Sequence, residues 1–133
     1  MKRLARLLLV FAAAAFVGAA QDDAGPWRAP DEAKTVKNPL EPTAEDVAAG
    51  QHLFRLNCQG CHGPKGDGNG AAAPGLPRKP ADFTDAMKMI ATTDGELFWK
   101  ITTGRPPMPP WTQLSDAERW QLVSYLRTFA KTR

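Results

Sequence analysis

Cysteine and histidine are scarce in this chain of 133 residues, which contains two of each. The two cysteines, Cys58 and Cys61, are followed at once by His62, and the other histidine is His52. A structural zinc site needs four protein ligands. On a predicted helix, His52 lies about 240° around the axis from Cys58, so its side chain faces elsewhere. A structural zinc site beside Cys58 is therefore disfavoured.

The chain also lacks strand-like alternation and a long apolar run. No segment alternates apolar and polar residues well enough to predict a β-strand, and no internal repeat is present. The apolar run over residues 7–20 has 14 residues, whereas a membrane-spanning helix needs roughly 20. The run follows three basic residues and ends in small ones, the layout of a secretory signal peptide cleaved after Ala20. We expect residues 1–20 to be that signal peptide, with a retained membrane anchor as the alternative.

Excess charge of one sign is absent once the leader is removed. The leader holds three of the 17 lysine and arginine residues, and the 14 that remain equal the 14 acidic residues. A mature chain of about zero net charge gives no reason to expect nucleic-acid binding or attraction to an anionic membrane. Export predicts a periplasmic protein, either free or peripheral to the inner membrane, with no span in the mature chain. An oxidising compartment also allows a disulfide between Cys58 and Cys61.

Three helices are predicted in a domain over residues 43–133, each with a hydroxyl N-cap residue and an acid three residues later. The pairs are Thr43 with Asp46, Thr93 with Glu96, and Ser115 with Glu118, the last two as capping boxes. The first helix runs into Cys58, the second ends at Gly104, and the third extends to about residue 131. Residues 21–42 carry four prolines and predict an extended arm or linker, packed on the domain through Trp27.

The expected fold class is therefore all-α with long loops. Glycine- and proline-rich stretches separate the three predicted helices. A core this small, with loops this long, is poorly stabilised by side chains alone. We expect something other than side chains to fill the middle of the domain.

The sequence Cys-Gln-Gly-Cys-His over residues 58–62 favours covalent haem attachment. A thioredoxin-like redox pair begins a helix after a strand, whereas this pair follows a helix. In haem attachment, the thiols of Cys58 and Cys61 form two thioethers with the porphyrin. His62 then lies under the ring as the proximal iron ligand.

A methionine is the expected ligand on the other side of the iron, because a thioether favours reduced iron. Met108 has two prolines on each side, whose fixed φ angles make its loop stiff. A stiff loop loses less entropy when its sulfur binds iron. Met87 and Met89 have helix-like spacing and are expected to pack against neighbours instead.

These motifs together resemble a class I monohaem cytochrome c, in particular the bacterial oxidase-associated and periplasmic carrier domains. The resemblance covers about residues 43–131 and includes the stretches GQHLFRLNCQGCHGPKGDG, PADF, DGELFWKITTGRPPMPPW and LSDAERWQLVSYLRTF. It implies a cytochrome c-like fold, with three main helices and long loops around one covalently bound haem c. It also implies that the first and last helices cross at Gly50, with Leu122 and Tyr125 as partners.

The resemblance further implies how the haem is surrounded. Pro80 would supply the carbonyl that accepts the other ring N–H of His62. Trp99, Arg105 and Trp111 are candidates for the haem pocket and the propionates. Core packing for the tryptophans and a solvated charge for the arginine are the alternatives.

One-electron transfer is the expected function, because two axial ligands leave the iron no vacancy for a substrate. The protein would be an electron carrier rather than an enzyme, either a monomer or a subunit of a complex. Its expected partners are a redox donor and an acceptor in membrane respiratory complexes or a periplasmic dehydrogenase. One alternative is a fixed haem subunit of such a complex. Another is a haem enzyme or ligand sensor with an open iron site.

Overall fold

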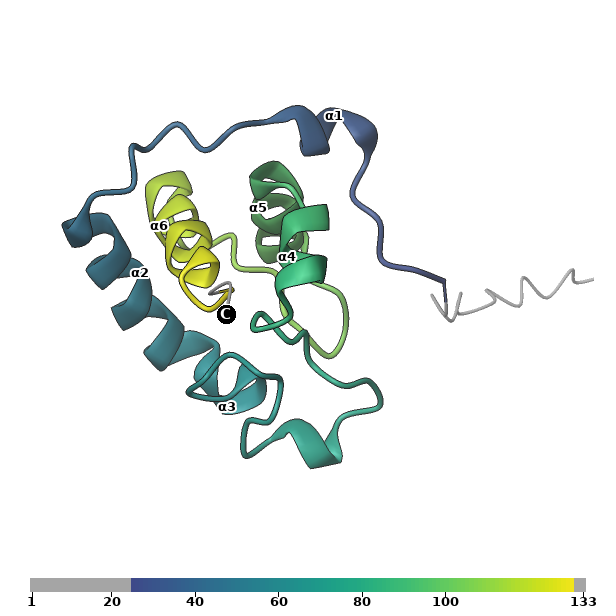
Figure 1. The fold of residues 1–133 in the computed structure, drawn as a ribbon. Helices are drawn as coiled ribbons and strands as arrows, with labels where there is room; N and C mark the ends of the chain where they lie inside the picture. Colours follow the sequence, from purple (N-terminus) through teal and green to yellow (C-terminus); the bar gives the residue numbers. More distant parts are fainter. Residues whose placement is uncertain (1–24, 131–133) are drawn as a thin grey trace, which may run out of the picture.

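The computed structural model describes residues 25–130, and the segment predicted to be a signal peptide lies outside this range (Figure 1). The described part of the chain is helical and contains no strand, so it is all-α as expected. None of the helices in residues 25–130 has the length and apolar character needed to cross a membrane. The elements are α1 (Asp31–Thr35), α2 (Ala44–Asn57), α3 (Gln59–His62), the 3-10 helix η1 (Ala73–Gly75), α4 (Ala86–Ala91), α5 (Asp94–Thr103) and α6 (Asp116–Arg127).

The predicted N-cap residues begin the three longest helices, α2, α5 and α6. The hydroxyl group of Ser115 accepts a hydrogen bond from the Glu118 N–H, and the Glu118 carboxylate accepts one from the Ser115 N–H, at 3.3 and 2.7 Å. Only half of the predicted box forms at Thr93, which accepts from the Glu96 N–H at 3.2 Å. The prediction of a full box there is wrong because the Glu96 carboxylate pairs with Lys100, 2.7 Å away and one turn along the helix.

Helices α2 and α6 cross at Gly50, as the resemblance implied. A Cβ atom on Gly50 would lie 2.0 Å from the carbonyl oxygen of Gln121 and 2.9 Å from the Cβ of Tyr125. The Gln121 backbone, next to the buried Leu122, therefore makes the nearest contact. Phe54, one turn along α2, is fully buried with its ring 5.4 Å from the Tyr125 ring. Glycine is needed here because the two backbones touch.

Helix α5 packs beside α6 and completes the core. Phe98 stacks on Trp120 with ring centroids 4.1 Å apart. Helix α6 ends at Arg127, four residues earlier than predicted. The Arg127 guanidinium donates to the Asp94 carboxylate at 2.7 Å and to the Thr92 carbonyl at 2.6 Å. It also donates to a carbonyl of α4, so it joins the last turn of α6 to the junction of α4 and α5.

The arm before α2 is not wholly extended, which corrects the prediction for residues 21–42. Pro30 precedes α1, and α1 lies on α5 so closely that a Cβ atom on Gly95 would be 2.0 Å from the carbonyl oxygen of Ala33. From α1 the chain runs over the ends of α5 and α6 toward α2 (Figure 1). Its later part is anchored by Asn38, whose amide donates to the hydroxyl group of Ser124 at 3.0 Å.

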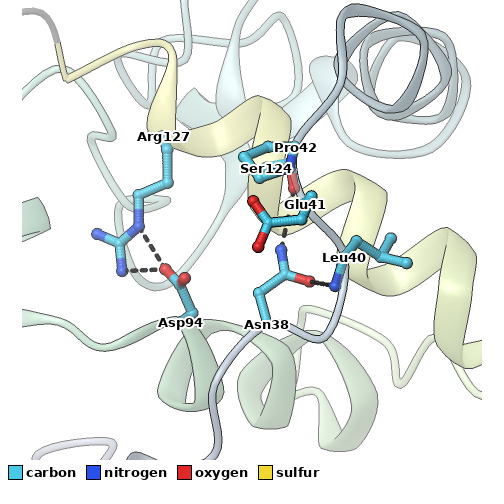
Figure 2. A pocket seen from close by; sticks show the side chains of 7 residues that line it. All are labelled: Asn38, Leu40, Glu41, Pro42, Asp94, Ser124 and Arg127. Carbon is cyan, nitrogen blue, oxygen red and sulfur yellow. Dashed lines mark hydrogen bonds and ion pairs between the residues drawn. The ribbon is translucent and has the colours of Figure 1, made fainter.

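A small polar pocket lies where the arm passes the ends of α5 and α6. Figure 2 shows the Asn38 amide turned toward Ser124 on one side of it, and the pair formed by Asp94 and Arg127 on the other. Glu41 reaches between them. Asn38 pairs with Ser124, and Asp94 pairs with Arg127, so the pocket lies at the boundary between the arm and the helices.

Candidate haem-binding site

The two thiols lie one turn apart at the junction of α2 and α3. The Cys58 carbonyl accepts from the N–H groups of Cys61 and His62 at 3.2 and 2.9 Å, which fixes that turn. Both thiols are free and half-buried. Burial raises the pKa of the Cys58 thiol to about 12, and the nearby Cys61 adds to the rise. Such a thiol is a poor nucleophile at neutral pH.

His62 is oriented by a backbone carbonyl. Its Nδ1 lies 3.2 Å from the carbonyl oxygen of Ala81. Because a carbonyl only accepts, the proton lies on Nδ1, and the lone pair of Nε2 is left for a metal. Burial lowers the pKa of His62, against the opposing effect of this hydrogen bond, so the ring is neutral at pH 7. The imidazole is thus held in the tautomer that an iron ligand requires.

The predicted role of Pro80 is wrong by one residue. The Pro80 carbonyl oxygen lies against Gly68 and would be 2.5 Å from a Cβ atom there. The next carbonyl, of Ala81, faces His62 instead. Gly68 has φ +75°, and its N–H donates to the His62 carbonyl at 2.9 Å. A residue with a Cβ atom would not fit between His62 and Pro80 in this conformation.

Phe83 supports the other side of the same imidazole, a contact that sequence reasoning missed. Its ring stacks on the His62 ring, with centroids 4.9 Å apart and an angle of 25° between the planes. Phe83 is buried, and its N–H donates to the Gly66 carbonyl at 2.7 Å. The loop after α3 therefore folds back on His62 and restricts its rotation.

Met108 lies in a closed turn after α5. The Arg105 N–H donates to the Met108 carbonyl at 2.9 Å, and the Met108 N–H donates to the Arg105 carbonyl at 2.8 Å. Gly104, with φ +61°, begins the loop, and the Trp111 N–H closes it by donating to the Ile101 carbonyl at 3.1 Å. Met108 is half-buried against the same hydrophobic core as Cys58. Backbone hydrogen bonds therefore hold the main chain of this loop.

The remaining predicted site residues fall in different surroundings. Trp111 is half-buried and packs on the same hydrophobic core as Met108. Trp99 contacts Trp27 of the arm, with ring centroids 6.4 Å apart, so its observed role is packing of the arm. The Arg105 guanidinium donates to the carbonyl oxygen of Gly25 at 2.7 Å. His52 is exposed on α2, as expected for a residue that is not a ligand.

The donor set in this region fits a haem. Two free thiols stand one turn apart, an imidazole presents Nε2, and a thioether lies in a fixed loop on the same core. Within residues 25–130, no three His, Cys, Asp or Glu side chains gather as a metal-binding group would require. Cys58 and Cys61 would hold the porphyrin, and His62 and Met108 would bind its iron.

Comparisons with known proteins agree with this chemistry. Residues 45–126 match the family described as cytochrome c oxidase, cbb3-type, subunit III. A cytochrome bc1 complex cytochrome c subunit of Corynebacterium diphtheriae is 34% identical over 98 residues, which cover 72% of this chain and 31% of that protein. A solved structure, the reducing HAO-like protein complex of Kuenenia stuttgartiensis, shares 32% identity with a TM-score of 0.62. The match covers 72% of this chain and 50% of that one, so this chain spans half or less of both relatives.

Proposed function

We propose that this chain transfers single electrons with His62 and Met108 as axial iron ligands. The chain belongs to the family described as cytochrome c oxidase, cbb3-type, subunit III, and it is an electron carrier rather than an enzyme. Haem c, when bound, would supply an iron that alternates between Fe(III) and Fe(II). Cys58 and Cys61 would attach it covalently. The sulfur of Met108 would favour the reduced iron and raise the reduction potential.

The observation that carries this proposal is the fixed imidazole of His62. His62 directly follows the second thiol, Cys61. Its Nδ1 is held by the Ala81 carbonyl, and the face of its ring is held by Phe83. Met108 is held separately by the paired backbone of its loop. Ligands that are fixed before an electron arrives need little reorganisation when the charge changes. Such an arrangement suits repeated electron transfer better than turnover of a substrate at iron.

We also propose that the protein acts as a fixed subunit of a respiratory complex in the periplasm. Both relatives described above are named as parts of complexes, which favours this role over a free shuttle. Its donor and acceptor would then be redox proteins of that assembly. Gentle purification of the exported protein from membranes tests this role. Co-migration with other redox subunits is expected, and recovery of the protein alone in the soluble fraction would contradict it.

The electron-transfer function is tested on the matured full-length protein. Acid-acetone extraction should leave the pigment on the polypeptide, and a potentiometric titration should follow a single one-electron curve for one haem. Carbon monoxide should bind the reduced protein slowly or incompletely at neutral pH, because Met108 occupies the site. Rapid and complete binding of carbon monoxide would support a haem enzyme or ligand sensor instead.

A further inference from the structure

The start of the described arm contacts the loop that carries Met108. The Arg105 guanidinium donates through Nη2 to the carbonyl oxygen of Gly25 at 2.7 Å, across 80 residues of sequence. The backbone of Arg105 is hydrogen-bonded to that of Met108 in both directions, at 2.9 and 2.8 Å. One residue therefore connects the arm with the turn that presents the methionine.

The arm itself is anchored on α5, the helix that leads into this loop. Trp27, two residues after Gly25, packs on Trp99 with ring centroids 6.4 Å apart. The ammonium group of Lys100 lies 5.6 Å from the centroid of the Trp27 ring, within the range of a cation–π contact. Lys100 is in turn paired with Glu96 at 2.7 Å. These contacts hold the Gly25 carbonyl in place whether or not Arg105 binds it.

A second anchor lies further along the arm. Helix α1 packs on α5 at Gly95, where a Cβ atom would be 2.0 Å from the Ala33 carbonyl oxygen and 2.6 Å from that of Val36. Figure 1 shows α1 over the end of α5. The arm is thus fixed to α5 at two places, and the end nearer to Met108 carries the hydrogen bond to Arg105.

We propose that residues 25–36, the arm brace, hold the Met108 loop closed, with Arg105 as the positioning residue that connects the two. This inference rests on the proposed function, in which the Met108 sulfur binds iron. The brace would slow the opening of the loop, and an external ligand would reach the iron only as often as the loop opens. Trp27 acts by fixing Gly25, and Arg105 acts by transmitting that position to Met108.

Imidazole binding to the oxidised, full-length holoprotein measures loop opening. At high imidazole concentration, the binding rate of the wild-type protein should reach a limit set by departure of the Met108 sulfur. We expect Arg105→Gln and Trp27→Ala each to raise this limiting rate about fivefold to tenfold, the factor that corresponds to about one net hydrogen bond. The double variant should be no faster than the faster single variant, because both changes break the same connection.

Two matched controls separate the brace from general stability. Lys34→Ala removes an exposed pair with Asp31 on α1 and should leave the limiting rate unchanged. Asn38→Ala removes the contact with Ser124 at the other end of the arm. It should lower the thermal unfolding temperature without changing the limiting rate.

The brace is refuted if Arg105→Gln and Trp27→Ala bind imidazole at the wild-type limiting rate. It is also refuted if Asn38→Ala accelerates binding as much as they do. A wrong assignment of Met108 as an iron ligand would give a different result in the wild-type protein. The wild-type protein would then lack the sulfur-to-iron absorption band and would bind imidazole in a fast step that does not saturate.

Discussion

The crossing of α2 and α6 is built from side chains, whereas the His62 and Met108 segments are held largely by the main chain. At the crossing, Phe54 and Leu122 are almost fully buried, and Gly50 lets the two backbones touch. At the candidate site, the fixed geometry comes from hydrogen bonds of loop carbonyls and N–H groups, including the Ala81 carbonyl on His62.

The helix crossing and the ligand loops meet two different requirements of the molecule. Side-chain packing brings the ends of the chain together and gives the fold its stability. Main-chain hydrogen bonds in loops of glycine and proline hold the two segments that carry the proposed iron ligands. Changes at the crossing should therefore affect unfolding, whereas changes in the loops should affect the properties of the bound iron.

The largest expected effect is that of Gly50→Ala. The new Cβ atom would be placed 2.0 Å from the Gln121 carbonyl oxygen, a backbone atom that cannot move independently. Overpacking of this kind costs about 3 kcal/mol of unfolding free energy. Chemical denaturation of the holoprotein measures the loss, and the reduction potential should stay at the wild-type value.

Gly75→Ala is the matched control for this change, because a Cβ atom on Gly75 would have no atom within 4 Å. Its unfolding free energy should lie close to that of the wild type. Equal stability of Gly50→Ala and Gly75→Ala would contradict the role assigned to the backbone contact at Gly50.

Gly68→Ala makes the same substitution in the loop that holds His62, instead of at the helix crossing. Gly68 has φ +75°, so alanine there would cost about 1–2 kcal/mol in backbone strain. Its Cβ atom would also press on the Pro80 carbonyl and shift the segment that carries the Ala81 carbonyl. A weaker hydrogen bond to His62 makes the imidazole a poorer donor to Fe(III), so the reduction potential should rise. A lower stability with an unchanged potential would contradict this role of the loop.

A smaller effect is expected for Ser115→Ala. This change removes the N-cap hydroxyl group of α6, which accepts from the Glu118 N–H at 3.3 Å. Loss of an N-cap costs about 1 kcal/mol of unfolding free energy. The absorption spectrum of the folded protein should not change, and a spectral change would show that α6 and the iron ligands are coupled.

Lowering the pH should have the smallest effect on the unfolding free energy, through the capping box of Ser115 and Glu118. Hydrogen bonds from the Ser115 N–H and hydroxyl group lower the pKa of Glu118 below 4.5. A carboxyl whose pKa is lower in the folded state adds stability above its unfolded pKa, and that stability is lost as pH falls through the folded pKa. Denaturation at a series of pH values below 5 should show a shallower acid loss for Glu118→Gln than for the wild type. Identical pH profiles would contradict the assigned cause.

Helices with local capping signals could be predicted from the sequence. Thr43, Thr93 and Ser115 are the N-caps of α2, α5 and α6, because the signal and the contact lie within four residues. Helix α1 was not predicted because its N-cap residue, Pro30, makes no side-chain cap and α1 is held by contact with α5. Helix α6 ends before its pattern suggests, and Arg127 in its last turn binds groups at the junction of α4 and α5.

Local patterns in the sequence indicate the candidate ligands, but not the residues that surround them. The spacing of Cys58, Cys61 and His62 is local, and so is the proline pattern around Met108. The carbonyl that orients His62 belongs to Ala81, 19 residues away, and the choice between Pro80 and Ala81 depends on how the loop closes on Gly68. Contacts over such distances in sequence leave no periodic signal.

The absorption spectrum of the oxidised Met108→Ala protein is the decisive test of Met108 as the second iron ligand. Met87→Ala is the matched control, because Met87 is 76% exposed on α4. We predict that the weak sulfur-to-iron band of the wild type is lost in Met108→Ala and retained in Met87→Ala. A band that persists unchanged in Met108→Ala would contradict the assignment of Met108 as the second iron ligand.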